Sequence, residues 1–363
     1  MGERRGSKRG GLAFAVALVM MLSGCSLVGD GRQVWDILQE ESEQKDALTA
    51  AVDELRALEG VESAHTRFRA DGPGGDEAGI TVVAKQGTAT PQLAAITAVA
   101  HEVLAGEKLV AAVPLFTLEI EGSGTFTQQA FGLSEDQLAT EITYWRAAED
   151  AVGAGLSLTL VENGAEPEYR REFRTPEDGD GQHLIDQFIA NYAELQRVPD
   201  RSTAPGWWLL PGLGIQQELP NAGLVSLLDR IRSVIPLRDL TRIPVSPPMD
   251  YEFPEGALVS WNQWQPDTPE SPRVDVVQNE YRQSDWTSVL EAAAITATVP
   301  HASFSYHAND VNGERDFRFF TRPCEGFIDV KEDDGTLVEA LAQAGTTLPP
   351  GGGPGACSPT PPA

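Results

Sequence analysis

Leucine-containing helical stretches recur along the chain at a nearly fixed spacing, and this recurrence limits the folds that the chain can adopt. Successive leucines lie 45, 45, 46 and 44 residues apart; a longer interval follows, and the last leucine comes 47 residues after the sixth: Leu48, Leu93, Leu138, Leu184, Leu228, Leu290 and Leu337. Recurrence every 20 to 50 residues or so is typical of repeated supersecondary units. Residue identity between the stretches is weak, so what repeats is the pattern.

The segments between the helical stretches alternate apolar and polar residues as β-hairpins do. Phe116, Leu118 and Ile120 alternate with polar neighbours, and Asn312-Gly313 is a turn sequence between two further strand-like runs. Period-2 alternation indicates strands with one buried face and one face in water. Because helices fall between the hairpins, we expect them to cover the buried face.

These patterns predict an α+β fold built from tandem αββ units. An αββαββ order is a circular rotation of the βαββαβ order of ferredoxin-like domains. We therefore expect two-layer ferredoxin-like modules, with antiparallel sheets that carry helices on one face. The expected α+β modules span 33–132, 133–219 and 220–346, and a Pro/Gly-rich tail covers 347–363.

The first 25 residues have the composition of an export signal. Residues 1–11 carry four basic side chains against one acidic one, residues 12–22 are uninterrupted apolar, and the small residues Ser23 and Gly24 precede Cys25. A basic start, a short apolar run and small residues at the cleavage point make a secretory signal. A transmembrane anchor is the alternative, but eleven apolar residues are too few when a bilayer span takes about 20.

Leu22-Ser23-Gly24-Cys25 resembles the lipobox of bacterial lipoproteins, and the resemblance covers only this targeting segment. It implies a signal peptide over 1–24, cleavage before Cys25, acyl chains such as palmitate at the lipidation site Cys25, and a lipidated linker over 25–32. Two or more acyl chains give stable membrane anchoring. The expected location is therefore the outer, extracytoplasmic face of the cell membrane, with the lipid anchor as the membrane contact.

The chain is strongly acidic, with a formal net charge of −27. Loss of residues 1–24, which hold four basic residues and one acidic residue, leaves the mature chain near −30. Such a surface repels nucleic acid, so no nucleic-acid partner is expected. A length of 363 residues favours two or three domains.

Three cysteines occur in the chain, and Cys25 is assigned to the lipid. The two others, Cys324 and Cys357, form an even remainder outside the cytoplasm, which favours a disulfide. Such a bridge would hold the Pro/Gly-rich tail against the last module. Two free thiols are the alternative.

Familiar catalytic and metal-binding motifs are incomplete. Ser42 and Lys45 match S-x-x-K without the companion motifs of the penicillin-binding enzymes. A calcium loop that began at Asp178 would require glutamate where Ile189 stands. We therefore predict no catalytic residues, no metal, no cofactor and no enzymatic activity.

Four tryptophans lie in two Pro-rich segments, 197–220 and 236–273, that are expected to be irregular connections or insertions. Tryptophan on a loop stacks on sugars or peptides, and it also fills gaps between domains. The possible ligand contacts are Trp207, Trp208, Trp261 and Trp264.

Together these features predict a non-enzymatic lipoprotein that presents α+β modules to an unknown protein or cell-envelope partner. A solute-binding protein of a transporter is the first alternative, and it would show two lobes of parallel strands. A cell-wall hydrolase is the second, and it would bring carboxylates or histidines together in a cleft.

Overall fold

The computed structural model describes residues 27–72, 75–106, 109, 112–153, 155–163, 169–175, 181–239, 254–262, 271–280, 282, 284–310, 313–320 and 329–330. The lipobox, Cys324, Cys357, Trp264, Leu337 and the tail at 347–363 lie outside these ranges. Among the helices in these ranges, none is long and apolar enough to cross a membrane.

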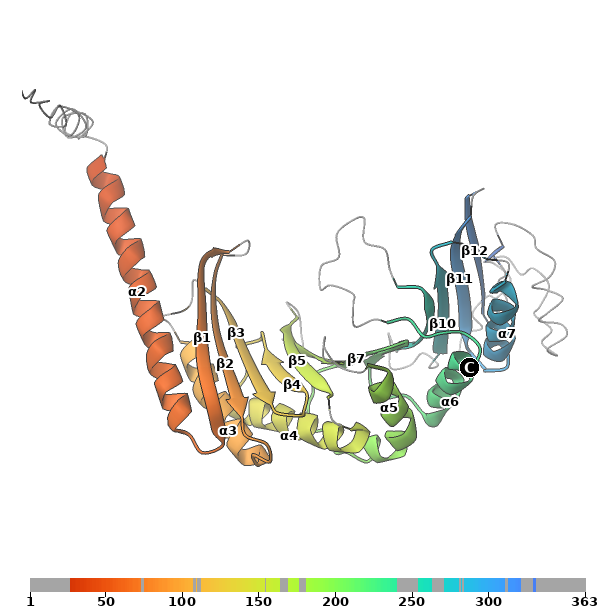
Figure 1. Ribbon diagram of the computed structural model, residues 1–363, viewed down its shortest axis with the longest axis horizontal. Helices are drawn as coiled ribbons and strands as arrows, with labels where there is room; N and C mark the ends of the chain where they lie inside the picture. Colours follow the sequence, from red (N-terminus) through yellow and green to blue (C-terminus); the bar gives the residue numbers. More distant parts are fainter. Residues whose placement is uncertain are drawn as a thin grey trace, which may run out of the picture.

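Helix–strand–strand units follow one another along the described chain (Figure 1). The first three are α2 (Leu27–Ala57), β1 (Val61–Gly72), β2 (Gly75–Ala84); α3 (Thr90–Leu104), β3 (Ala112–Ile120), β4 (Thr125–Gln128); and α4 (Glu135–Val152), β5 (Ser157–Glu162), β6 (Tyr169–Arg174). The next three are α5 (Gly181–Leu195), β7 (Gly206–Leu210), β8 (Leu213–Gln217); α6 (Ala222–Arg232), β9 (Gly256–Asn262), β10 (Ser271–Gln278); and α7 (Trp286–Ala297), β11 (Ser303–Asp310), β12 (Gly313–Phe320), after which comes β13 (Asp329–Val330). The α+β class and the tandem αββ order are confirmed, and the first six recurring leucines lie on α2 to α7.

Helix α4 illustrates how the sequence determines where the helix of a unit starts, which face it buries and where it ends. Ser134 caps its start, because the Ser134 hydroxyl accepts from the Gln137 backbone N–H while the Gln137 side chain accepts from the Ser134 N–H. Leu138 and Trp145 are among the residues that form its buried face. The helix ends at Gly153, whose φ of 104° suits glycine.

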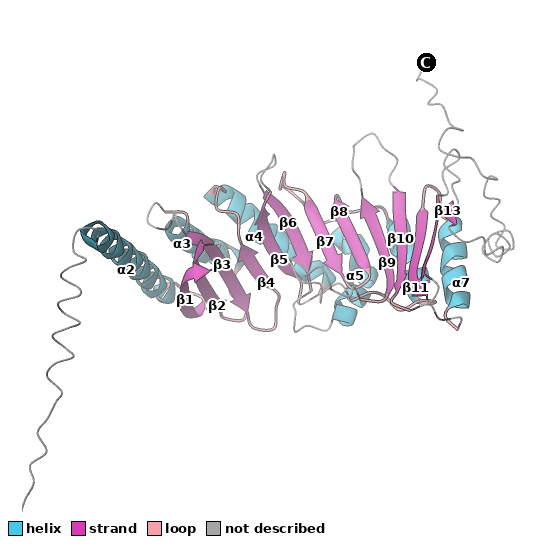
Figure 2. Ribbon diagram, turned by 90° about the horizontal axis from the view of Figure 1, so that it is seen from above, coloured by secondary structure: helices cyan, strands magenta, loops and turns pink. Residues whose placement is uncertain are grey.

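The strands form one 13-stranded sheet in which spatial order follows chain order from β1 to β13. The two strands of each unit pair antiparallel, as β3 does with β4. Strands joined through a helix pair parallel, as β2 does with β3 and β4 does with β5. Seen from above, the strands lie side by side with the helices behind them (Figure 2).

This topology corrects the expected modules with antiparallel sheets. In a ferredoxin-like, split βαβ module, another strand lies between the two strands that a helix joins. Here those two strands are direct, parallel neighbours, so the sheet is mixed and continuous. Strands β4 and β5 pair across the expected boundary near 132, and β8 and β9 pair across the one near 219. The domain boundaries themselves stay a prediction.

The sheet has a helix-covered face and an open face. Side chains on the covered face, such as Phe116, Leu118 and Phe126, are fully buried against the helices. The sheet curves so that the helices lie on the outer side of the bend and the open face lines its inner side (Figure 1). The core is therefore a continuous layer between sheet and helices.

Two expected irregular segments contain regular strands. Residues 197–220 hold the hairpin of β7 and β8, and residues 236–273 hold β9 and the start of β10. Strands β7 and β8 are only five residues long, and β7 (GWWLL) is apolar on both faces, which conceals the period-2 signal. Likewise α2 begins at Leu27, inside the expected linker at 25–32, although two glycines there are poor helix formers.

A buried carboxylate joins the second and third units. Glu149 on α4 is 3% exposed and accepts hydrogen bonds from the backbone N–H groups of Gly124, at 2.7 Å, and Gly155, at 3.2 Å. It also accepts from the Ser123 hydroxyl and from Arg146. These contacts bring the turn between β3 and β4 close to the start of β5.

Candidate functional site

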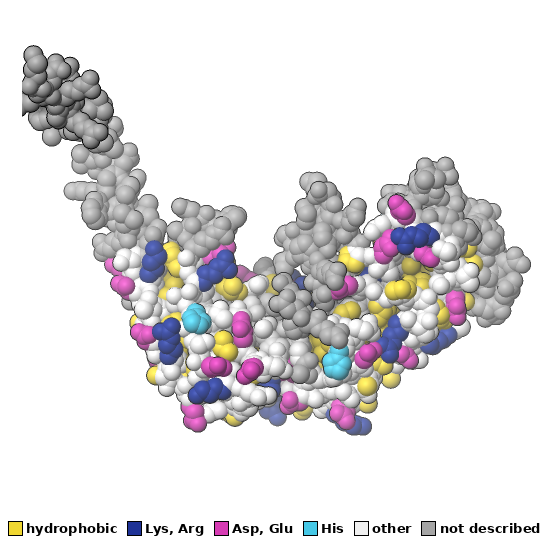
Figure 3. All heavy atoms as spheres, in the orientation of Figure 1, with side chains coloured by type: hydrophobic (Ala, Val, Ile, Leu, Met, Phe, Trp, Pro, Cys, Tyr) yellow, Lys and Arg dark blue, Asp and Glu magenta, His cyan; other side chains and the backbone are white. Residues whose placement is uncertain are grey.

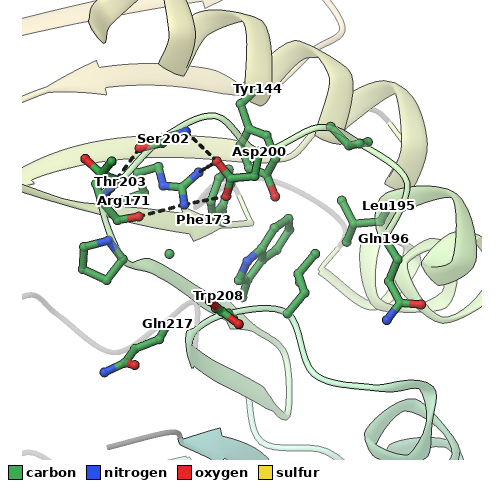
Figure 4. A pocket seen from close by; sticks show the side chains of 16 residues that line it. Tyr144, Arg171, Phe173, Leu195, Gln196, Asp200, Ser202, Thr203, Trp208 and Gln217 are labelled. Atoms are coloured by element: carbon green, nitrogen blue, oxygen red, sulfur yellow. Dashed lines mark hydrogen bonds and ion pairs between the residues drawn. The ribbon is translucent and has the colours of Figure 1, made fainter. Parts of the chain in front are cut away.

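A cavity of about 850 Å³ lies between the carboxyl end of α5, strands β6 to β8 and helix α4 (Figure 4). We call it the Arg171 pocket. Polar and aromatic side chains both contribute to its walls, chiefly Tyr144, Arg171, Phe173, Asp200, Trp208 and Gln217.

Arg171 reaches the pocket because it occupies a helix-facing position of β6, and it is only 4% exposed. Its two terminal nitrogens donate to the two carboxylate oxygens of Asp200, at 3.0 and 2.8 Å. One of them also donates to the Ala204 carbonyl, at 2.8 Å. Asp200 and Ala204 lie between α5 and β7, so the guanidinium holds this connection in place.

Aromatic rings surround the guanidinium. The Arg171 Cζ atom lies 4.9 Å from the ring centroid of Tyr144 and 5.9 Å from that of Phe173. Phe173 stacks on Trp208, with centroids 4.1 Å apart and planes inclined by 16°. Because arginine is planar and weakly hydrated, it is the cation best suited to this environment.

Glu141 on α4 lies fully buried beside the pocket. Its Oε1 atom accepts from the Tyr169 hydroxyl at 2.8 Å and from the Ser202 hydroxyl. Its Oε2 atom is 3.8 Å from Arg171 Nε, and within the described residues neither atom has a hydrogen-bond partner. Burial raises the pKa of Glu141, because desolvation of the carboxylate outweighs the opposing effects of the Arg171 charge and of the hydrogen bonds from Ser202 and Tyr169.

Burial also raises the pKa of two tyrosine hydroxyls in this cluster. The pKa of Tyr169 rises to about 12, and the neighbouring Glu141 adds to the effect of burial. Burial is also the main cause that raises the pKa of Tyr144. Both hydroxyls therefore stay neutral at physiological pH and act as hydrogen-bonding groups.

The walls of the pocket combine polar side chains with aromatic rings. Its lining includes neither histidine nor cysteine. Across the described ranges, no group of three His, Cys, Asp or Glu side chains could hold a metal ion. Gln196, Gln217 and Ser202 supply polar groups beside the rings of Tyr144 and Trp208. A small ligand with an apolar face and hydrogen-bonding edges fits this chemistry.

Three of the four tryptophans expected to contact a ligand lie within the described residues, and they are distributed over both faces of the sheet. Trp208 lines the pocket but is 1% exposed, and Trp261 is buried on the helix-covered face. Trp207 lies on the open face, half-buried, with Arg170 Cζ 4.5 Å from its ring centroid. These strand positions correct the expectation that the tryptophans lie on irregular connections.

Sequence reasoning missed Arg171 and Glu141, the two charged residues at the centre of the site. A signal for Arg171 exists in the strand YRREFR, where period-2 alternation puts it on the same face as Tyr169 and Phe173. No comparable signal marks Asp200 or Ser202, because both lie in a connection whose path depends on Arg171.

Comparison of the chain with known protein families and with curated protein sequences finds no match. Inferences about its function therefore rest on the geometry of the chain itself.

Proposed function

We propose that this chain is an extracytoplasmic lipoprotein, anchored through Cys25 to the outer face of the cell membrane, that displays its sheet to a protein or cell-envelope partner and has no enzymatic role. The observation that carries the proposal is the continuous sheet, whose described helices lie on one face only. The open face extends over the successive units and is free for a partner.

The chemistry of the exposed surface supports an interaction role. Side chains of both charge signs are interspersed with polar and apolar groups on the side shown in Figure 3. The overall charge of −27 opposes binding to nucleic acid. A protein or an envelope polymer suits such a mixed surface better than a strongly charged polymer does.

Helix α2 supports the anchoring part of the proposal. It has 31 residues, which span about 46 Å, and it begins two residues after Cys25. Leu48, Val52 and Leu55 near its end are buried against the first unit. Its other end extends away from the body, on the side of the open face (Figure 1). A lipid at Cys25 would then leave the open face turned toward the membrane, with α2 as a spacer.

Replacement of Cys25 tests the anchor. We expect Cys25→Ala to give a precursor that keeps residues 1–24 and incorporates no acyl chain, because the thioether needs the Cys25 sulfur. Metabolic labelling with a palmitate analogue, followed by mass measurement of the chain, checks this. The matched control is Cys324→Ala, which should label as the parent chain does. Labelling of the Cys25→Ala variant would contradict the lipobox assignment.

The proposal retains the disulfide between Cys324 and Cys357, since an extracytoplasmic address favours oxidised cysteines. Both cysteines lie outside the described residues. The bridge would fix the tail at 347–363 to the last unit.

Site-specific photo-crosslinking tests the interaction face. A photoreactive residue at Thr127, on the open face of β4, should give adducts with a partner in the native membrane at several times the yield of one at Thr143. Thr143 is the matched control, because it is a threonine exposed on α4, on the opposite side of the sheet. Equal crosslinking yields at Thr127 and Thr143 would contradict the proposed interaction face.

The Arg171 pocket favours a second candidate function, the binding of a small solute. Its volume of about 850 Å³ is in the range of ligand sites. The expected two lobes of a transporter's solute-binding protein are not seen in the described part of the chain, where one sheet is continuous. Equal crosslinking yields combined with a thermal shift on addition of one solute would favour this candidate over the first.

A further inference from the structure

A groove of about 510 Å³ crosses the open face of the first three units, at right angles to the strands. Its floor is formed by residues on successive strands, since Arg67 pairs with Gly79 and Gly79 pairs with Leu115. The remaining floor and wall residues belong to β2, β3, the residue after β4, and β5: Glu77, Ala78, Val113, Pro114, Gln129, Val161 and Glu162. We call this feature the cross-strand groove.

Gly79 gives the groove part of its depth. It lies inside β2, where a side chain would otherwise stand on the open face. A Cβ atom at this position would meet no atom closer than the Leu115 carbonyl oxygen, at 3.5 Å, so packing does not require glycine here. A glycine inside a strand often marks a bulge, a bend or a site of close approach by a ligand or another backbone. Gly79 pairs in regular register with Arg67 and Leu115, so a bulge does not explain it.

Apolar surface is exposed at the same place. Val113 is 50% exposed, and among the described residues it is the large apolar side chain that stands out as exposed. Leu115 and Val161 lie on the same face and are partly exposed. The groove therefore offers an apolar floor to an occupant.

A row of threonine hydroxyls runs alongside this floor. The row is in register across four strands, because Thr81 pairs with Thr117, Thr117 with Thr127, and Thr127 with Thr159. With strands about 4.8 Å apart, the row is about 14 Å long. Each threonine is two positions along its strand from a floor residue, or from Gln129 just past the end of β4.

No partner for these four hydroxyls is found among the residues that the structure describes. Thr125 and Ser157, two residues away from Thr127 and Thr159 on their strands, differ in this respect, because their hydroxyls bond to each other at 3.1 Å. The threonine row is thus a line of donors and acceptors that faces out of the sheet beside an apolar floor.

Charge in the groove is close to balanced, although the chain as a whole carries −27. Arg67 and Glu77 at one end pair with each other, with Nη2 and Oε2 3.8 Å apart. Glu162 lies at the other end. An anionic occupant would find no cluster of positive charge here, and a cationic one would find only Glu162 beyond the Arg67–Glu77 pair.

The groove is also poorly suited to an extended peptide. Peptides add to sheets at strand edges, where backbone N–H and C=O groups are available. Strands β2 to β5 are interior strands with partners on both sides, so their ladder groups are used within the sheet. The threonine row and Gln129 offer side-chain hydroxyl and amide groups instead.

We propose that the cross-strand groove binds an uncharged glycan strand. The apolar faces of the sugar rings would pack on Val113, Leu115 and Val161, and their hydroxyl groups would bond to the threonine row. The inference rests on the proposed function, since it names the partner of the open face. It places that partner at the first three units and away from the Arg171 pocket.

Calorimetric titration of the full-length chain in detergent tests the groove, with a neutral N-acetylglucosamine pentamer as probe and a polygalacturonate pentamer as the acidic comparison. We expect the neutral probe to bind and the acidic one not to. Gly79→Val fills the floor and should weaken binding at least tenfold. The pair Thr117→Val and Thr127→Val removes two hydroxyls at nearly constant volume, and each lost hydrogen bond should weaken binding about fivefold.

Two control variants separate local from general effects. Gly214→Val changes a glycine on the open face of β8, outside the groove, and Thr143→Val removes a hydroxyl on α4. Both should bind as the parent chain does, with circular dichroism and thermal melts reporting that each variant is folded. Binding that survives both Gly79→Val and the threonine pair would overturn the site.

The remaining outcomes distinguish the groove from the proposed function. Absence of neutral-probe binding, or preference for the acidic probe, overturns the uncharged-glycan proposal. If Thr127 then still crosslinks to a protein, the interaction face stands and only its assigned partner is wrong. If Thr127 and Thr143 crosslink equally while the pentamer binds the groove, the glycan site stands without the proposed protein contact.

Discussion

Replacement of Arg171 by methionine is expected to lower the free energy of unfolding by about 3 kcal/mol, near the lower end for the loss of one partner of a buried ion pair. The change removes the partner of Asp200 and the donor to the Ala204 carbonyl. The effect stays near the lower end because Asp200 is 37% exposed and can regain water. The connection between α5 and β7 should loosen along with the global loss.

Urea denaturation of the two chains measures this difference, and hydrogen exchange of residues 199–205 measures the local loosening. Arg174→Met is the matched control, because Arg174 lies on the same strand but on the open face, 32% exposed. Its buried partner Glu172 keeps a second partner, Arg170, at 2.8 Å, so the change should cost less than about 1 kcal/mol. If Arg171→Met and Arg174→Met cost the same, the buried arginine does not organise the pocket.

Gly124→Ala is expected to cost about 3 kcal/mol, at the upper end for overpacking. A Cβ atom at this position would overlap the carbonyl oxygen of Leu156 and lie 2.9 Å from the Ser157 backbone nitrogen. Both neighbours are backbone atoms, which no side-chain rotation can move. The shift would also disturb the hydrogen bond from Gly124 N–H to Glu149.

Thermal and urea unfolding of the variant check this expectation. Gly214→Ala serves as the control, since its Cβ would meet nothing closer than 3.7 Å and it should change stability by less than about 1 kcal/mol. A Gly124→Ala chain as stable as its parent would show that the junction between the second and third units adjusts freely.

The elements that the sequence predicts well are those with a local period. The recurring leucines predict α2 to α7, and alternation such as that of Phe116, Leu118 and Ile120 predicts the hairpin of the second unit. Strand β7 escapes prediction because Trp207 and Trp208 make both of its faces apolar, and β8 is only five residues long. Continuity of the sheet has no local signal, since parallel pairing between units joins residues 30 or more positions apart, such as Gly79 and Leu115.

The candidate site is less predictable than the fold. Arg171 could be placed on the helix-covered face from the alternation in β6, but its partners could not, because Asp200 lies in a connection without period. The threonine row depends on the register in which the β-strands pair. Thr81, Thr117, Thr127 and Thr159 become neighbours only when each β-strand pairs in one particular alignment, which the sequence does not reveal.

Sequential strand order has a consequence for how such a chain can change in evolution. Each unit pairs only with the unit before and the unit after it. A gene duplication or deletion that spans a whole number of units would therefore lengthen or shorten the curved surface while it leaves the other interfaces intact. In a protein of this design, selection can adjust the length of the curved surface by one unit at a time.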